Sequence, residues 1–406
     1  MSAQASLPAT ESSDGKPKMG LKRGKSLNKF ARKKPKMGKD EEEKVCPVKQ
    51  EDIELELDEK VVDSCEAKLE PRENISINLK AGEVSETLPL HTGARIPTLQ
   101  FGSYKLKGLE SFEATLSALK QGYRGVDTAT CYDNEKQVGQ AIEASGLKRE
   151  ELFVQTKLWR SYSGIEPKSG KPRCDTWLRK SLKLLGIAKL DLWLMHWPGP
   201  GRHLNYPPVK MGMERPKLVK SENASRMAPM DWTPATRLET YKLMAKHVPG
   251  TVAALGVCNF SARQLTELLE FCKDNRLPRP AVVQNECHPY LPARQVRAVC
   301  KENGIVFQAY ASLGAGMLPL LNDSTITSIA SRLSVSPGQV LLRWGLQQGV
   351  ALLPKSCKAE RQKQNLEVWH FSLSAEDLAL IAKLDRSQEN QNTMAGWLRE
   401  HDPDFY

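Results

Sequence analysis

The sequence predicts an α/β fold, a (β/α)8 barrel with an N-terminal β-hairpin cap, preceded by a disordered N-terminal tail. Short strand-like apolar runs alternate eight times with helical patterns, and most connections between them are short. Strands that alternate with helices of about 10–15 residues form parallel sheets, and eight such units close into a barrel. A barrel of about 250 residues or more can form one domain, so residues 75–406 are interpreted as a single unit.

The first 74 residues differ from the rest because they are polar, rich in Lys and Glu, and nearly free of aromatic residues, which predicts disorder. Residues 1–39 carry a net charge of +9 and residues 40–74 carry −9, so the two halves cancel. The runs Lys22-Arg23 and Arg32–Lys36 resemble a two-part nuclear localisation signal. A solvated basic tail is one alternative, and an organellar transit peptide is another, although the excess of Lys over Arg disfavours it.

The hairpin and the strands are predicted from apolar runs bounded by turn residues. Ser85–Leu90 and Arg95–Thr98 flank a turn at residues 91–94 and predict the hairpin. The eight barrel strands are expected at Leu99–Gly102, Arg124–Asp127, Leu152–Lys157, Leu190–His196, Val252–Val257, Ala281–Glu286, Val306–Ala311 and Ala351–Pro354.

Helical periodicity predicts the segments that separate and follow these strands. The expected helices are Leu109–Gln121, Asn134–Ser145, Pro172–Leu185, Pro234–Lys246, Ala262–Asn275, Ala293–Asn303, Ser336–Gln348, Ala359–Leu366 and a final Ser374–Leu384. One connection is long, the Pro- and Gly-rich segment Gly199–Thr233 after the fourth strand. A loop of that length in a compact domain indicates function.

The composition narrows the class of protein. The chain is 40% apolar and has no run of about 18 apolar residues and no apolar leader, so we expect neither a membrane span nor secretion. Nine cysteines without a CxxC pair indicate reduced thiols, a cytoplasmic location with a nuclear one as an alternative, and no metal site. The whole net charge of +11 falls on residues 75–406, which favours a polyanionic cofactor or, equally, describes an ordinary basic surface.

Candidate catalytic residues lie at the carboxyl ends of successive strands. Asp127 and Lys157 end two consecutive strands, and Tyr132 follows in the loop after Asp127. Parallel strands place these ends on one face of a barrel, where such folds carry their active sites. A free tyrosine has a pKa of about 10, and a neighbouring ammonium lowers that pKa by favouring the phenolate. The three residues therefore indicate a tyrosine general acid.

The same stretch carries a signature. Its matching positions are Gly122-Tyr123-Arg124, Val126-Asp127-Thr128-Ala129, Glu135 and Val138-Gly139. With these residues the chain resembles the aldo-keto reductases over residues 85–400, although Gly125 stands where a larger residue is usual. The resemblance implies a catalytic tetrad of Asp127, Tyr132, Lys157 and His196, the last at the end of the fourth strand.

The resemblance also implies a role for each member of the tetrad. Tyr132 donates a proton to a substrate carbonyl oxygen, Lys157 paired with Asp127 lowers the pKa of Tyr132, and His196 orients the carbonyl group. The residue types alone leave structural alternatives open. Asp127 and Lys157 can form an ion pair that only closes strand ends, Tyr132 can be a surface aromatic, and His196 can be a core histidine.

A dinucleotide site is predicted at later strand ends. No GxGxxG follows a strand, which disfavours a Rossmann site. Leu353–Ser356, Arg361 and Gln364-Asn365 match the family's third signature, at the eighth strand end where barrels bind phosphate. The two cations Lys355 and Arg361, with the Ser356 hydroxyl, favour a 2′-phosphate and hence NADP(H) over NAD(H). A basic helix start on the surface is the alternative.

The remaining cofactor contacts follow from the resemblance alone. Gly256–Phe260 resembles the second signature, with Cys258 where serine is more usual and Ala253 where a basic residue is usual. Asn259 and Gln284 are expected to bind the nicotinamide amide, and Tyr310 to stack on its ring. Tyr310–Gly314 lacks the family's usual serine and proline, which predicts weaker affinity. Further contacts are expected from Gly102, Ser103, Asp127, Cys258, Leu313, Gln364 and Asn365.

Tyr104, Trp159 and Trp197, with His196, are expected to line an apolar substrate pocket, although the two tryptophans can instead simply pack the barrel top. The resemblance thus implies NADPH-dependent reduction of aldehydes and ketones by an enzyme of the alcohol dehydrogenase (NADP+) type. Nothing in the sequence demands more than a monomer, and only the tail favours nucleic acid, so we expect a monomer that binds none. A catalytically quiet NADP(H)-binding regulatory barrel, which works through partners of the charged tail, is the alternative.

Overall fold

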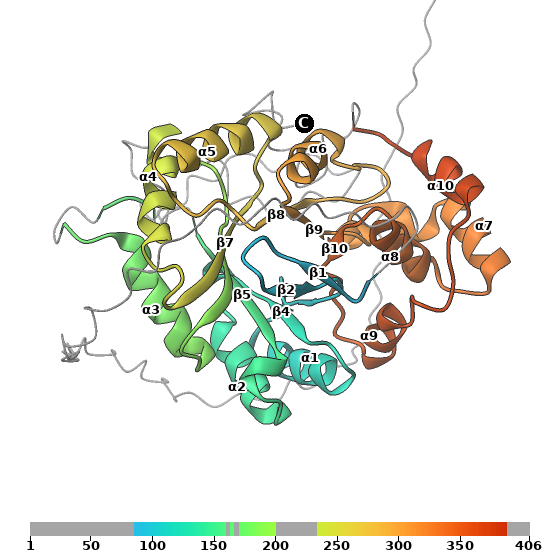
Figure 1. Cartoon of the computed structure of the whole chain (residues 1–406). Coiled ribbons are helices and arrows are strands. Elements are labelled where there is room, and N and C mark those ends of the chain that lie inside the picture. Colours follow the sequence, from blue (N-terminus) through green and yellow to red (C-terminus); the bar gives the residue numbers. More distant parts are fainter. Residues whose placement is uncertain (1–84, 160–162, 166–169, 200–233, 388–406) are drawn as a thin grey trace, which may run out of the picture. The chain divides into compact units, whose positions relative to one another are not determined.

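The computed structural model describes residues 85–159, 163–165, 170–199 and 234–387 (Figure 1). The predicted disordered tail, most of the predicted loop Gly199–Thr233 and the segment after residue 387 lie outside these residues. The predictions made for them, including the division at residues 74/75, therefore stay predictions.

Eight parallel strands form the centre of the fold, as predicted (Figure 1). The sheet closes into a barrel where Leu99 bridges Leu352 in parallel. Two backbone hydrogen bonds support this closure, from Gln100 to the Leu352 carbonyl at 3.0 Å and from Leu352 to the Thr98 carbonyl at 2.7 Å. In chain order the strands are β3 (Phe101–Gly102), β4 (Gly125–Asp127), β5 (Phe153–Leu158), β6 (Leu190–Met195), β7 (Val252–Cys258), β8 (Val282–Glu286), β9 (Val306–Tyr310) and β10 (Ala351–Leu352).

Helices surround the barrel (Figure 1). They are α1 (Gly108–Lys120), α2 (Glu135–Ser145), α3 (Arg173–Leu185), α4 (Pro234–Ala245), α5 (Ala262–Asp274), α6 (Arg294–Glu302), α7 (Ser324–Leu333), α8 (Pro337–Gln347), α9 (Ala359–Leu366) and α10 (Ala375–Ala382). The sequence analysis missed α7, whose Ser, Thr and Ile residues are weak helix formers. The Asp323 side chain caps this helix by accepting hydrogen bonds from two backbone amides, and Ile326 and Ile329 are buried. Tertiary packing, rather than helix propensity, therefore determines that α7 forms.

The predicted hairpin covers one end of the barrel (Figure 1). Strands β1 (Thr87–Pro89) and β2 (Arg95–Pro97) pair antiparallel. Their buried side chains Leu88 and Ile96, with Leu90, join an apolar cluster that includes Phe153, Leu192, Val282 and Val306 from the barrel strands. Burying a side chain of this size stabilises the fold by about 1.5–3 kcal/mol.

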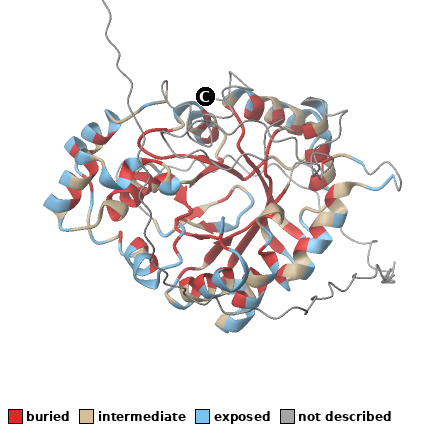
Figure 2. Cartoon of the chain, turned by 180° about the vertical axis from the view of Figure 1, so that it is seen from behind, coloured by how far each residue is buried: buried red, intermediate tan, exposed pale blue. Residues whose placement is uncertain are grey.

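Side chains alternate between the two faces of each barrel strand. In β5, Val154 joins the large core between sheet and helices, whereas Phe153 belongs to the interior cluster beside the hairpin. The next residue on the interior face, Gln155, hydrogen-bonds to Gln308 of the distant strand β9. Figure 2 shows the consequence, with buried strands at the centre and exposed residues on the outer sides of the helices.

Gly125, the position that departs from the family pattern, is explained by its neighbour. A Cβ atom on Gly125 would lie 2.3 Å from Cγ of Gln100. The Gln100 side chain therefore occupies the space that a larger residue at position 125 would need. Its amide nitrogen donates to the Pro97 carbonyl at 3.2 Å, while its buried Oε1 has no hydrogen-bond partner among the described residues.

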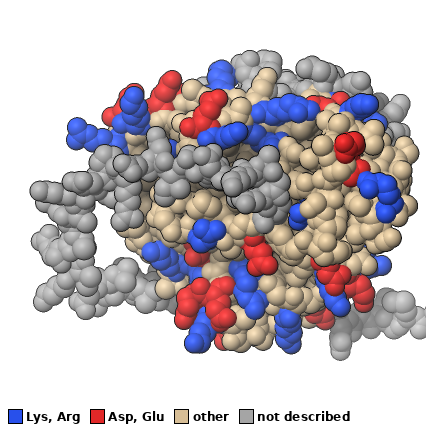
Figure 3. Space-filling model, turned by 45° about the vertical axis from the view of Figure 1, so that its right-hand side comes forward, with Lys and Arg blue, Asp and Glu red and all other residues tan. Residues whose placement is uncertain are grey.

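The surface of the described residues carries both signs of charge. On the face drawn in Figure 3, Lys and Arg side chains are interspersed with Asp and Glu. Among the helices in the described ranges, none is long and apolar enough to cross a membrane.

Candidate active site

A buried ammonium lies at the centre of the candidate site. Lys157 is fully buried near the end of β5, and its Nζ donates to Asp127 Oδ1 at 2.6 Å, to the Thr128 carbonyl at 2.9 Å and to Tyr132 Oη at 3.2 Å. An ammonium has three N–H donors, so these three contacts satisfy it completely. The structure thus brings together Asp127, Tyr132 and Lys157 as the strand-end argument predicts.

The loop after β4 places the tyrosine over this ammonium. A short 3₁₀ turn, Thr130–Tyr132, ends at Asp133, whose left-handed backbone (φ 57°) reverses the chain. Thr130 Oγ1 donates to the Lys157 carbonyl at 3.0 Å and accepts from the Trp159 amide at 3.1 Å, which ties the loop to β5. The Lys157 Nζ consequently lies 4.8 Å from the centre of the Tyr132 ring.

The predicted direction of the Tyr132 pKa is wrong in this structure. Burial, and then the nearby carboxylate of Asp127, raise the pKa of Tyr132 well above its ordinary value of about 10. Desolvation of the buried phenolate is the largest cause of this rise in the pKa of Tyr132. The phenol is therefore protonated at neutral pH, as a proton donor must be.

Aromatic rings surround the phenol, including the residues predicted to bind substrate. The Tyr132 ring lies 5.0 Å from Tyr104 and 5.7 Å from His196, and His196 lies 5.1 Å from Trp159. Trp197 stacks on His196 at 6.2 Å and is buried, whereas Tyr104 is 39% exposed. Tyr104 and Trp159 thus flank the site, and Trp197 packs behind His196.

The predicted nicotinamide contacts already hydrogen-bond to one another and to the site. The Asn259 amide nitrogen donates to the His196 carbonyl at 2.9 Å and contacts Cys258 Sγ at 3.2 Å, while its Oδ1 accepts from the Tyr310 hydroxyl at 2.6 Å. Gln284 Nε2 donates to Asp127 Oδ2 at 3.0 Å. Asn259, Cys258, Gln284 and Tyr310 therefore lie together, next to the buried ion pair.

The predicted phosphate-binding residues Lys355 and Ser356 lie in the connection from β10 to α9, and Arg361 lies in the first turn of α9. Lys355 and Arg361 are exposed, and the Ser356 hydroxyl accepts from the Lys358 amide at 3.0 Å. The sequence analysis missed a third cation, Lys105 in the loop after β3, whose pKa is lowered by burial and by the positive charge of Lys355. Cations that crowd one another in this way fit the phosphates of a dinucleotide.

The other predicted cofactor residues support the same rim or lie beside it. Gly102 donates its amide to the Pro354 carbonyl at 3.1 Å, and Ser103 Oγ donates to the Asp127 carbonyl at 2.8 Å. Leu313 packs against the core in the loop after β9. On α9, Gln364 is exposed, whereas Asn365 is buried near the Tyr123 hydroxyl.

The sequence analysis also missed two residues that contact the predicted tetrad and a third that supports one of them. Cys131 Sγ lies 3.6 Å from His196 Nδ1. Gln155 donates to Asp127 Oδ2 at 2.6 Å, and Gln308 hydrogen-bonds to Gln155. A signal for the two glutamines was present, because each directly follows two apolar residues inside a buried parallel strand.

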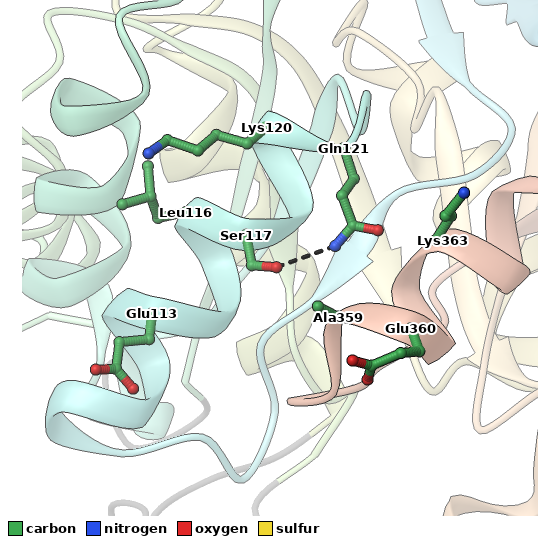
Figure 4. Close-up of a pocket in the computed structure, with 8 residues that line it drawn as sticks. All are labelled: Glu113, Leu116, Ser117, Lys120, Gln121, Ala359, Glu360 and Lys363. Carbon is green, nitrogen blue, oxygen red and sulfur yellow. Dashed lines mark hydrogen bonds between the residues drawn. The ribbon is translucent and has the colours of Figure 1, made fainter.

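A surface cavity of about 630 Å³ lies elsewhere, between α1 and α9 (Figure 4). Ser117 of α1 and Gln121, the residue that caps its C-terminus, hydrogen-bond to each other at 3.0 Å in it. The other residues that line it are Glu113, Leu116, Lys120, Ala359, Glu360 and Lys363. None of them belongs to the predicted tetrad or to the predicted cofactor contacts, so the cavity is not the candidate active site.

Comparison with known proteins gives a consistent result. Glycerol 2-dehydrogenase (NADP(+)) of Saccharomyces cerevisiae is 39% identical over 306 residues, which are 75% of this chain and 92% of that protein. Glyoxal reductase of Bacillus subtilis is 35% identical over 75% of this chain and 95% of its own length. The structure of the aldose reductase from Schistosoma japonicum superposes with a TM-score of 0.64 at 30% identity and covers 79% of this chain and 98% of that one. The family model described as "Aldo/keto reductase family" matches residues 98–386, and the chain belongs to that family.

Proposed function

We propose that this protein reduces aldehydes and ketones to alcohols with NADPH, as an aldehyde reductase or alcohol dehydrogenase (NADP+). The observation that carries the proposal is the fully buried ammonium of Lys157, which donates hydrogen bonds to Asp127 Oδ1 and to Tyr132 Oη. A structural ion pair needs no phenol at its open end. A phenol in that place can act as a general acid, and the phenolate that it leaves is the group that the ammonium would stabilise.

The four residues have distinct roles in the proposed reaction. Bound NADPH supplies the hydride for the carbonyl carbon. Tyr132 Oη donates its proton to the carbonyl oxygen, which leaves a phenolate. Lys157 stabilises that phenolate through its hydrogen bond, and Asp127 holds Lys157 in place. His196, whose ring lies 5.7 Å from the Tyr132 ring, is in a position to orient the carbonyl group.

The residues fit NADP(H) in two places. Lys105, Lys355 and Arg361 would hold the phosphates, and their combined positive charge exceeds what a diphosphate alone requires. Asn259 and Gln284 would hold the nicotinamide amide. Both of their amide nitrogens already donate to protein acceptors, so their oxygens are the groups to offer. The Asn259 Oδ1 accepts from the Tyr310 hydroxyl and keeps a second lone pair for this contact.

The relatives suggest the substrate class. Glycerol 2-dehydrogenase and glyoxal reductase are named for small oxygen-rich molecules. We propose that this chain takes small aldehydes and ketones between Tyr104 and Trp159. All four proposed catalytic side chains come from one chain, which supports action as a monomer.

The test is NADPH consumption with a carbonyl panel that contains glyoxal, dihydroxyacetone, glyceraldehyde and a nitrobenzaldehyde. The wild-type chain is expected to turn over at least one of them, and Tyr132→Phe is expected to reduce kcat by about 10²–10⁴-fold, since it removes the general acid. Tyr241→Phe, which removes a buried hydroxyl that donates to the Pro278 carbonyl outside the site, is the matched control and is expected to keep kcat within a few-fold.

A direct measurement of NADPH binding, by quenching of the protein's tryptophan fluorescence, completes this test. If Tyr132→Phe turned over at the wild-type rate, the proposed acid would be wrong. Tight NADPH binding without turnover of any carbonyl would favour the catalytically quiet barrel instead.

A further inference from the structure

Three buried glutamines form a hydrogen-bonded network beneath the predicted tetrad. Gln155 Nε2 donates to Asp127 Oδ2 at 2.6 Å and to Gln308 Oε1 at 2.9 Å. Gln284 Nε2 does the same, at 3.0 Å to Asp127 and 2.8 Å to Gln308. The glutamines come from β5, β8 and β9, so the network spans the barrel interior, and each of them is at most 2% exposed.

The charge of Asp127 fixes the orientation of every amide in the network. A carboxylate only accepts hydrogen bonds, so Gln155 and Gln284 must both turn their NH₂ groups toward Oδ2. Each NH₂ has a second hydrogen, and both second hydrogens go to Gln308 Oε1, which has two lone pairs. Gln308 Nε2 in turn donates to Gln155 Oε1 at 3.3 Å. The only arrangement that satisfies these groups is the one in which all three amides point as observed.

The two oxygens of Asp127 consequently have different partners. Oδ2 is held by the two amides, and Oδ1 accepts from the Lys157 ammonium at 2.6 Å. Without the amides, the buried Oδ2 would be left without hydrogen-bond donors and the carboxylate would be destabilised. It would also be able to turn and draw the ammonium away from Tyr132, which Lys157 contacts at a longer 3.2 Å.

We propose that Gln155 and Gln308 are positioning residues for the reaction. They fix the Asp127 carboxylate and thereby hold the Lys157 ammonium against the Tyr132 hydroxyl. Neither touches Tyr132 Oη, so both act through Asp127. This inference rests on the proposed carbonyl reduction, and it adds a second tier of residues below the tetrad.

Gln155→Met and Gln308→Met test the proposal, because methionine keeps the length of the side chain and removes the amide. Each variant is expected to lower kcat at least tenfold while the KM for the carbonyl and the Kd for NADPH stay within threefold. Gln339→Met is the matched control. Gln339 is also a buried glutamine, but it caps α8 and hydrogen-bonds to the Glu367 carbonyl, so its kcat is expected to stay within twofold.

A second measurement does not depend on turnover. The buried Lys157 ammonium is expected to give a protected ¹⁵N–¹H resonance, assigned by its loss in Lys157→Met. In Gln155→Met this resonance is expected to broaden or vanish, and in Gln339→Met to remain. Should both interior variants fold with kcat within twofold of wild type and an unchanged ammonium signal, the proposal is overturned. If the wild-type chain turns over no carbonyl, the proposed function fails, while the resonance still decides whether the glutamines position Lys157.

Discussion

The barrel interior has two levels that are built from the same strands but from opposite kinds of residues. The lower level contains Phe153 and other apolar side chains of the barrel strands, against which Leu88 and Ile96 of the hairpin pack. The upper level contains the glutamine network with Asp127 and Lys157. In β5 the two levels are two residues apart, Phe153 below and Gln155 above, because alternate residues of a strand share one face.

The difference teaches how the fold separates stability from chemistry. The lower level stabilises through apolar burial, at about 25 cal/mol per Å². The upper level adds little net stability, because desolvating a buried ion pair offsets its attraction. What the upper level contributes is a fixed geometry in which the contacts of Asp127 and Lys157 are all satisfied.

The largest effect is expected from breaking the ion pair in the upper level. Lys157→Met removes the group that stabilises the Tyr132 phenolate, so kcat is expected to fall by about 10²–10⁴-fold. The same variant leaves the Asp127 carboxylate buried and uncompensated, which is expected to cost about 3–5 kcal/mol of the free energy of unfolding. Carbonyl reduction and urea denaturation measure the two effects.

The double variant Asp127→Asn/Lys157→Met separates chemistry from stability. Replacing both charges is expected to restore most of the lost stability, because no unpaired charge remains. The rate is expected to stay low, since no ammonium faces Tyr132. Recovery of turnover in the double variant would show that Lys157 acts only as a structural partner.

A smaller effect is expected from the buried thiols at alkaline pH. Burial raises the pKa of Cys287 to about 12, and also that of Cys272, above the ordinary value of 9.0. Their stabilisation is complete below pH 9 and is lost as pH rises toward 12, because only the unfolded chain ionises in that window. Ionisation of each thiol in the unfolded chain is expected to lower the free energy of unfolding by about 1.4 kcal/mol per pH unit above pH 9.

Urea midpoints at pH 8, 9 and 10 measure this loss of stability. Cys287→Ala is expected to reduce the slope of the free energy of unfolding against pH by the contribution of one thiol. This change in slope is independent of the stability that the cavity left by the substitution removes at pH 8. An identical slope for Cys287→Ala and the wild type would mean that Cys287 does not contribute to the alkaline loss.

The smallest effect is expected from a glutamine outside the network. Gln100→Met removes one hydrogen bond to the Pro97 carbonyl and a buried Oε1 that has no partner among the described residues. Losing an unsatisfied acceptor offsets the lost bond, so the free energy of unfolding is expected to change by less than about 1 kcal/mol, with kcat unchanged. The same substitution at Gln155 is expected to lower kcat at least tenfold. Denaturation and turnover of Gln100→Met and Gln155→Met therefore compare the loss of a glutamine amide outside the network with its loss inside the network.

Much of this fold is readable from local patterns. Apolar runs and helical periodicity predicted the hairpin, the eight strands and nine helices of the described region to within a few residues. Helix α7 was missed because Ser324–Leu333 has low helix propensity and forms through burial of Ile326 and Ile329. Strand β3 is shorter than predicted, and Leu99 takes part only through the bridge that closes the barrel.

The sequence by itself determined the barrel and placed Asp127, Tyr132 and Lys157 at neighbouring strand ends, because strand order and side-chain alternation follow from local periodicity. Only the tertiary structure decided the direction of the Tyr132 pKa, the fit of Gln100 beside Gly125, and the contact between Gln155 and Gln308. These depend on desolvation and on contacts between residues far apart in the chain, such as the 153 positions between the two glutamines. Such contacts arise when the barrel closes, and no local pattern of residues specifies them.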